Sequence, residues 1–241
     1  MAQAYTKEQM QEAVARIRRE IASAAARSGR REEDITLCAV CKTRDSDTVR
    51  LSAQLNVDIF GENHMQELVA HACDGAFLGK AAHFIGHLQT NKVKKIVGLA
   101  DVIQSVDSLK LLEAIDSEAA RRNITQDILI EVNIGLEESK SGVLPDSLPY
   151  LLEESAKRSH LRLRGLMAIP PAWCTGDESR RYFEQMRRLF ESLRGQNYPN
   201  ALPDILSMGM SGSYIEAILE GATLVRVGTA IYGPRDYGNK V

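Results

Sequence analysis

The sequence has few cysteines, no long apolar run and no excess of one charge. Its four cysteines, Cys38, Cys41, Cys73 and Cys174, are too few and too scattered for a disulfide scaffold in 241 residues. The polar N-terminal segment lacks the apolar core of a signal peptide, and no stretch of about 18 apolar residues follows. These absences argue against a disulfide-held or membrane-spanning protein, and we expect a cytoplasmic one without a membrane partner.

The charge balance argues against nucleic acid as a partner. Lysine and arginine number 30 and aspartate and glutamate number 32, which gives a formal net charge of −2. Basic runs at 92–95 and 187–188 fall in helix-like stretches, where a solvated helix face is the simpler interpretation.

Two pairs of candidate metal ligands lack the grouping that a metal site needs. Cys38 and Cys41 form a C-x-x-C pattern, but the odd offset within a strand sends the two thiols to opposite faces. His83 and His87 share one strand face, yet no further ligand is grouped with them. Neither pair therefore predicts a metal or redox site.

Short apolar, β-branched runs alternate with helical patterns along the chain. An N-terminal helix begins at a capping box of Thr6 and Gln9 and is predicted to end near Gly29. Strands are predicted at 35–40, 57–60, 83–87, 102–106, 128–134, 161–169, 205–208 and 224–231. Helices are predicted between them at 45–55, 62–72, 91–99, 108–122, 145–159, 175–193 and 213–220, the sixth with a capping box of Thr175 and Glu178.

This alternation predicts parallel βαβ units and an α/β fold. Eight such units within one domain's length favour a closed (β/α)₈ TIM barrel over an open doubly wound sheet. We expect residues 1–241 to form that single domain, with the N-terminal helix supplying the outer helix that the eighth strand lacks.

Uncommon polar residues gather where the predicted strands end, which is where barrels of this kind carry their functional groups. They include Lys42, Glu62, Asn63, His87, Asp107, Asn133, residues 207–213 and residues 226–229. Solvated surface residues would not be expected to gather at this one end of the barrel.

Lys42 is the candidate nucleophile. It shares strand parity with Cys38 and Val40, while the residues between them take the opposite face. A lysine desolvated at the rim of an apolar barrel has a lowered pKa, and its free amine can attack an aldehyde to form a Schiff base. A lysine that reaches solvent or pairs with Glu62 is the alternative, and Lys42 alone does not decide between them.

The segment Ser207 to Ser213 is a candidate phosphate site. It is rich in glycine, leaves a predicted strand and opens a helix, so its backbone N–H groups can converge on an anion. Phosphate sites in these barrels commonly follow strands seven and eight, and Gly228 and Thr229 are placed to supply the other half.

Arg226 interrupts an apolar strand and therefore needs an acceptor. A bound ligand and a salt bridge to Glu131 are equally compatible with the spacing.

Seven sequence blocks together resemble the pyridoxal phosphate homeostasis protein family, whose barrel is similar to the N-terminal domain of alanine racemase. They are AVCKT at 39–43, GEN at 61–63, HFIGHLQTNK at 83–92, EVNIG with ESKSG at 131–142, GLMAIP at 165–170, SMGMS at 207–211 and VRVGTAIYG at 225–233. The resemblance spans nearly the whole chain. It departs from the common pattern at His64, Cys41 and Ser213, where Tyr, Ser and Asp are frequent.

The resemblance implies a set of residues around pyridoxal 5′-phosphate (PLP). Lys42 would carry the cofactor as a Schiff base, and Arg226 would face the pyridine nitrogen, where a permanent cation makes the ring a poor electron sink. The remaining contacts would be Asn63 and Ser207 along the pocket and Ser211, Gly212, Gly228 and Thr229 at the phosphate.

The leading hypothesis is a non-catalytic PLP-binding protein of vitamin B6 homeostasis, which stores, buffers or delivers the cofactor. We expect a monomer, with apo-forms of PLP enzymes as candidate partners. An amino-acid racemase is the main alternative, but it needs a second acid/base group, which the resembling racemases take from a separate C-terminal domain. A Schiff-base aldolase acting on a phosphorylated sugar would also need a lysine and a phosphate site.

Overall fold

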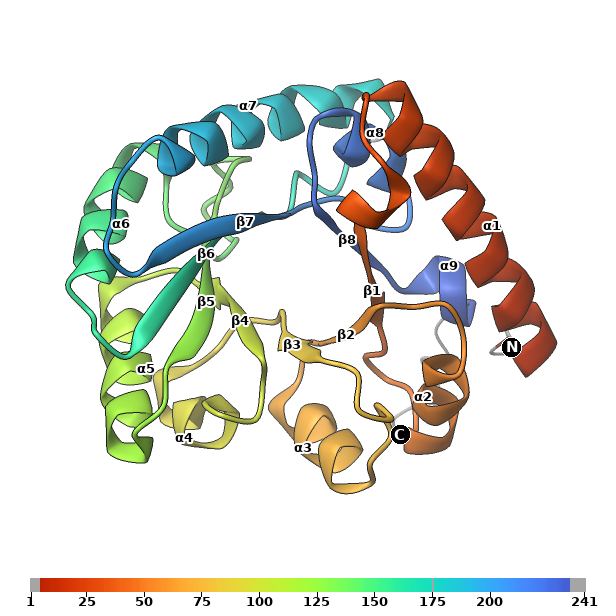
Figure 1. Ribbon diagram of the computed structural model, residues 1–241, viewed down its shortest axis with the longest axis horizontal. Helices are drawn as coiled ribbons and strands as arrows, with labels where there is room; N and C mark the ends of the chain where they lie inside the picture. Colours follow the sequence, from red (N-terminus) through yellow and green to blue (C-terminus); the bar gives the residue numbers. More distant parts are fainter. Residues whose placement is uncertain (1–4, 175, 235–241) are drawn as a thin grey trace.

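The strands form a closed parallel barrel. The computed structural model describes residues 5–174 and 176–234. Eight strands lie side by side in chain order, and β8 pairs with β1 to complete the ring (Figure 1). The predicted (β/α)₈ architecture is confirmed, and the open sheet is excluded.

Each strand overlaps its predicted range, although the third ends at Phe84 and not at residue 87, and the seventh begins at Ala201 and not at residue 205. The strands are β1 Thr36–Val40, β2 Ile59–Glu62, β3 Ala82–Phe84, β4 Val102–Val106, β5 Gln126–Val132, β6 Leu161–Ala168, β7 Ala201–Ser207 and β8 Leu224–Val227. The prediction that the last strand continues to residue 231 is wrong, because the chain turns at Gly228 into a short helix.

Helices cover the outside of the barrel (Figure 1). They are α1 Lys7–Arg27, α2 Ser46–Ala53, α3 Met65–Cys73, α4 Val93–Ile96, α5 Leu109–Arg122, α6 Leu148–Ala156, α7 Asp177–Arg194, α8 Tyr214–Leu219 and α9 Thr229–Tyr232. Single 3₁₀ turns lie at η1 Glu32–Asp34, η2 Thr90–Lys92 and η3 Pro145–Ser147. None of the described helices is long and apolar enough to cross a membrane.

The first predicted capping box is confirmed, and the second stays a prediction. Thr6 and Gln9 exchange side-chain and backbone hydrogen bonds at the start of α1. Thr175 lies outside the described residues, and Gly176 precedes α7 without a side-chain cap.

The N-terminal helix α1 packs beside α8 and α9, next to the strands where the barrel closes (Figure 1). Its buried side includes Met10, Val14, Ile17 and Ile21, as the spacing predicts. The expected covering role of this helix is therefore confirmed, and α9 shares it.

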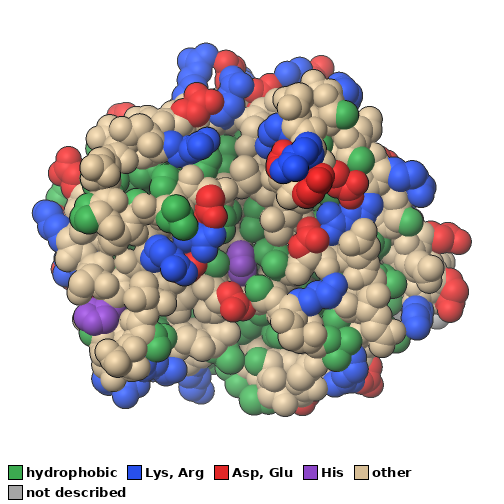
Figure 2. Space-filling model, viewed as in Figure 1, with side chains coloured by type: hydrophobic (Ala, Val, Ile, Leu, Met, Phe, Trp, Pro, Cys, Tyr) green, Lys and Arg blue, Asp and Glu red, His purple; other side chains and the backbone are tan. Residues whose placement is uncertain are grey.

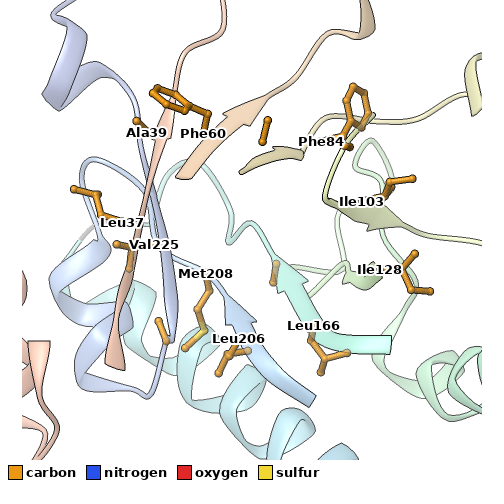
Figure 3. Close-up of a cluster of buried hydrophobic side chains, with 14 of the residues drawn as sticks. Leu37, Ala39, Phe60, Phe84, Ile103, Ile128, Leu166, Leu206, Met208 and Val225 are labelled. Carbon is orange, nitrogen blue, oxygen red and sulfur yellow. The ribbon is translucent and has the colours of Figure 1, made fainter. Parts of the chain in front are cut away.

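Strand parity separates two sets of apolar side chains. Leu37 and Ala39 of β1 belong to the large cluster between strands and helices, with Phe60, Ile103 and Leu206 of other strands (Figure 3). Cys38 and Val40 belong to a smaller cluster with Ile85 and Leu224. Lys42 shares the parity of this second set, so it follows the face that lines the barrel interior.

The amino end of the barrel is held by paired charges. Asp127 accepts hydrogen bonds from Arg162 and Arg164, and Arg164 also pairs with Asp204. These groups line a cavity of about 490 Å³, but their charges are already paired with one another. Basic and acidic side chains are also mixed over the face in Figure 2, with no large patch of one sign.

Candidate functional site

A cavity opens at the carboxyl ends of the strands, where the predicted site residues meet. It has a volume of about 220 Å³. Its lining includes seven of the eight predicted residues, and four apolar side chains complete it. The lining residues are Val40, Lys42, Asn63, Ile85, Ile169, Met210, Ser211, Gly212, Arg226, Gly228 and Thr229.

Lys42 stands two residues beyond the end of β1 and is partly exposed. Val40 and Ile85 form an apolar wall next to it in the same cavity. The next residue, Thr43, has a φ of 65°, a conformation that is uncommon outside glycine. The chain therefore turns sharply after Lys42, and the lysine is the last residue that follows the inner face of β1.

Arg226 is fixed in the floor of the cavity by a buried polar network. Its guanidinium donates to the Ser207 hydroxyl and to the carbonyl oxygen of Ala168, the latter over 2.9 Å. Ser207 in turn donates to Gln104 Oε1 over 2.6 Å, and Gln104 Nε2 lies 2.8 Å from His83 Nδ1. Burial lowers the pKa of His83 to about 4, so its neutral ring can accept this bond.

Burial and neighbouring charge also set the state of Arg226. Burial lowers the pKa of Arg226 to about 10, and the guanidinium still remains charged at neutral pH. No ion pair joins it to Glu131 within the described ranges, so the salt bridge considered from the sequence is not observed. Burial, with the Asp107 carboxylate adding to it, raises the pKa of Glu131 to about 7, although the charge of Arg226 opposes this rise.

Ser207 is placed below the cavity and not on its wall. It is fully buried, and its hydroxyl is occupied by Arg226 and Gln104. The structure thus gives it the contacts of a residue that holds Arg226 in place. Gln104 was missed by sequence reasoning, although a glutamine inside the apolar run of a predicted strand was an available signal.

Two loops bring backbone N–H groups and hydroxyls to one side of the cavity. The Ser211 hydroxyl accepts hydrogen bonds from the backbone of Gly228 (3.2 Å) and Ala230 (3.3 Å), which joins the β7–α8 loop to the start of α9. Gly212 has open space around the position where a Cβ would lie. Ser211, Gly212, Gly228 and Thr229 of these two joined loops all line the cavity.

Asn63 supplies an orphaned polar atom. Its Oδ1 is buried and has no hydrogen-bond partner among residues 5–174 and 176–234. A buried polar atom without a partner costs free energy, and a ligand in the cavity would satisfy it.

Comparisons with known proteins agree with this geometry. The family described as alanine racemase, N-terminal domain, matches residues 13–236. A pyridoxal phosphate homeostasis protein of Aquifex aeolicus is 40% identical over 226 residues, which cover 94% of this chain and 98% of that protein. The chain belongs to the pyridoxal phosphate homeostasis protein family. The resemblance inferred from the sequence blocks is therefore confirmed.

Two further proteins are also similar over most of their length. The Escherichia coli K12 protein is 37% identical over 232 residues, covering 94% of this chain and 97% of its own. A structure of PipY from Synechococcus elongatus PCC7942 with PLP bound is 33% identical, with a TM-score of 0.76, and covers 83% of this chain and 93% of that chain.

Proposed function

We propose that this chain binds PLP through a Schiff base on Lys42 and serves in vitamin B6 homeostasis without evident catalysis. The observation that carries the proposal is the convergence of Lys42, the buried Arg226 and the two phosphate-type loops on one cavity. The PLP-bound structure of PipY, a relative at 33% identity, supports it.

The residues of the cavity fit this cofactor. Asn63 Oδ1 is an unsatisfied buried acceptor, and the open space at Gly212 leaves room beside the loop that would hold the phosphate. PLP supplies an aldehyde, which condenses with a primary amine with loss of water. Val40 and Ile85 line the cavity together with Lys42 and give it an apolar wall.

The other residues would bind and orient the cofactor. Ser211, Gly212, Gly228 and Thr229 would hold the phosphate through hydroxyl and backbone N–H groups. Arg226 would direct its positive charge at the pyridine nitrogen and disfavour protonation there, and Ser207 would hold the guanidinium in that position.

The set of ionisable groups supports binding without catalysis. Among the described residues that line the cavity, Lys42 and Arg226 are the ionisable ones. A racemase needs two acid/base groups on opposite faces of its substrate, and a guanidinium that stays charged at neutral pH is poorly suited to this role. Release of the cofactor to apo-forms of PLP enzymes, and the monomeric state, remain part of the proposal.

Visible absorption during titration with PLP tests this function. The wild-type chain is expected to develop the yellow band of a protonated Schiff base at one equivalent, and Lys42→Ala is expected to lose it. Lys94→Ala, which removes an exposed lysine of α4 away from the cavity, is the matched control and is expected to behave as wild type.

Two results would overturn the proposal. A folded wild-type chain that takes up no PLP, or a Lys42→Ala variant that keeps the band, contradicts the role of Lys42. Racemisation of alanine or other amino acids by the PLP-loaded chain at turnover rates typical of enzymes contradicts the absence of catalysis.

A further inference from the structure

Three buried side chains converge behind Lys42, outside the barrel and away from the cofactor cavity. Cys41 follows β1, Glu62 ends β2 and His71 belongs to α3. The Cys41 thiol donates to Glu62 Oε1 over 2.8 Å, and His71 Nδ1 lies 2.7 Å from the same oxygen. Cys41 and Glu62 are fully buried and His71 is 3% exposed.

The orientation of the His71 ring is fixed by a contact of its second nitrogen, Nε2, which faces away from Glu62. Its Nε2 lies 3.0 Å from the carbonyl oxygen of Arg44, which can only accept, so Nε2 carries a hydrogen. In the neutral ring the lone pair of Nδ1 then points at the Glu62 carboxylate. Two acceptors at this distance need a proton or a metal ion between them, and a backbone carbonyl on the far nitrogen is the usual support of a metal-bound histidine.

The carboxylates around this cluster are incompletely satisfied. Glu62 Oε2 and Glu67 Oε2 are buried and have no hydrogen-bond partner in the part of the chain that the structure describes. Glu67 Oε1 accepts from the backbone N–H of Thr43 over 3.1 Å. Two carboxylates in one buried place, each with a free oxygen, are stabilised by a cation.

We propose that Cys41, Glu62 and His71 form a binding site for a divalent transition-metal ion of the zinc type. One ligand atom from each residue lies within 4.8 Å of the others. Thiolate, imidazole and carboxylate together form a donor set that Zn²⁺ accepts in tetrahedral coordination, and Glu67 is a further oxygen donor beside them. Metal binding displaces the thiol proton of Cys41 to solvent.

The site would stabilise the segment that carries Lys42. The Cys41 side chain, the Thr43 N–H and the Arg44 carbonyl each contact Glu62, Glu67 or His71. A metal ion would therefore fix residues 41–44 from the outer side of the barrel, while Lys42 faces the cavity. The metal site does not depend on the proposed PLP function, because none of its three ligands lines the cofactor cavity.

Cobalt titration of the full-length chain tests the site. The reduced protein is treated with a chelator and then titrated with Co²⁺ in the absence of oxygen. Its absorption spectrum is recorded at each step, and the spectrum of the same sample without cobalt is subtracted. We expect one Co²⁺ per chain, with the thiolate charge-transfer band and tetrahedral d–d bands of a Cys-ligated ion, and displacement by Zn²⁺. Cys41→Ser keeps a hydroxyl that can donate to Glu62 but removes the thiolate, so the band should disappear and the affinity should fall at least about tenfold.

Cys73→Ser is the matched control, because Cys73 lies on α3 and its thiol is exposed outside the cluster. It is expected to bind Co²⁺ as wild type does. His71→Gln provides a second variant of the site and should also lose affinity, with folding of each variant checked by circular dichroism. The proposal is overturned if the folded wild-type chain binds no Co²⁺, or if binding persists in both Cys41→Ser and His71→Gln, which would mean a surface site only.

Discussion

At the scale of single residues, Lys42 and Arg226 differ in how far the sequence could define them. The parity of Cys38, Val40 and Lys42 along β1 predicts a common face, and the structure places that face in the barrel interior. For Arg226 the sequence left a ligand and Glu131 as equal alternatives. Its observed partners, Ser207 and the Ala168 carbonyl, come from β7 and β6, and only closure of the barrel brings them together.

Glu131 predicts a pH dependence of stability. Its pKa is raised to about 7, so the folded state binds this proton more tightly than the unfolded chain, where the pKa is near 4.5. The contribution of the protonated Glu131 side chain to the stability of the folded state is fully present below about pH 4.5, and it is lost as the pH rises through 7. Glu131→Gln should therefore increase the free energy of unfolding by on the order of 2 kcal/mol at pH 8 and by much less at pH 5.

Urea unfolding of the two proteins at both pH values measures this difference. Glu153→Gln, which changes an exposed carboxylate of α6, is the control and should give no pH-dependent gain. An equal effect of Glu131→Gln at pH 5 and pH 8 would show that its carboxyl group titrates normally in the folded chain.

At the scale of elements, the pattern located the strands and helices but not the turn after β8. The β-branched residues Val227, Thr229 and Ile231 favour a continued strand. In the structure the backbone N–H of Ile231 bonds the carbonyl of Gly228, and a short helix forms where Ser211 accepts hydrogen bonds from the same backbone. A tertiary contact therefore overrides the local preference, which no single segment could reveal.

The two glycines of the loop between β7 and α8 are expected to differ in how much a substitution destabilises the protein. Gly209 has a φ of 88°, and an added Cβ would lie 2.5 Å from the Cβ of Ala217. Gly209→Ala should therefore reduce the free energy of unfolding by about 2 kcal/mol. Gly212 has open space and is not in the positive-φ region, so Gly212→Ala should change it by less than about 0.5 kcal/mol.

Urea denaturation of both variants beside the wild type measures these effects. Equal stabilities of Gly209→Ala and wild type would mean that the loop can rearrange, so that the close approach to α8 is not required for its position.

At the scale of the whole molecule, the eight alternating units predicted the closed barrel, and seven of the eight predicted site residues line the cavity at its rim. The Cys41, Glu62 and His71 cluster was not predicted. These residues are separated in the chain, and the sequence pattern pairs Cys41 with Cys38, which lies on the opposite strand face, and not with Glu62 or His71. Adjacent strand ends and one helix bring the cluster together, so its signal is in the tertiary structure.

The central claim is that the described cavity holds PLP covalently on Lys42. Borohydride reduction of the PLP-loaded chain, followed by mass spectrometry of the intact protein and its peptides, tests this most directly. The account predicts one pyridoxyl phosphate per chain, located on the peptide that contains Lys42. An unmodified chain, or a label spread over exposed lysines and equally present in Lys42→Ala, would contradict it.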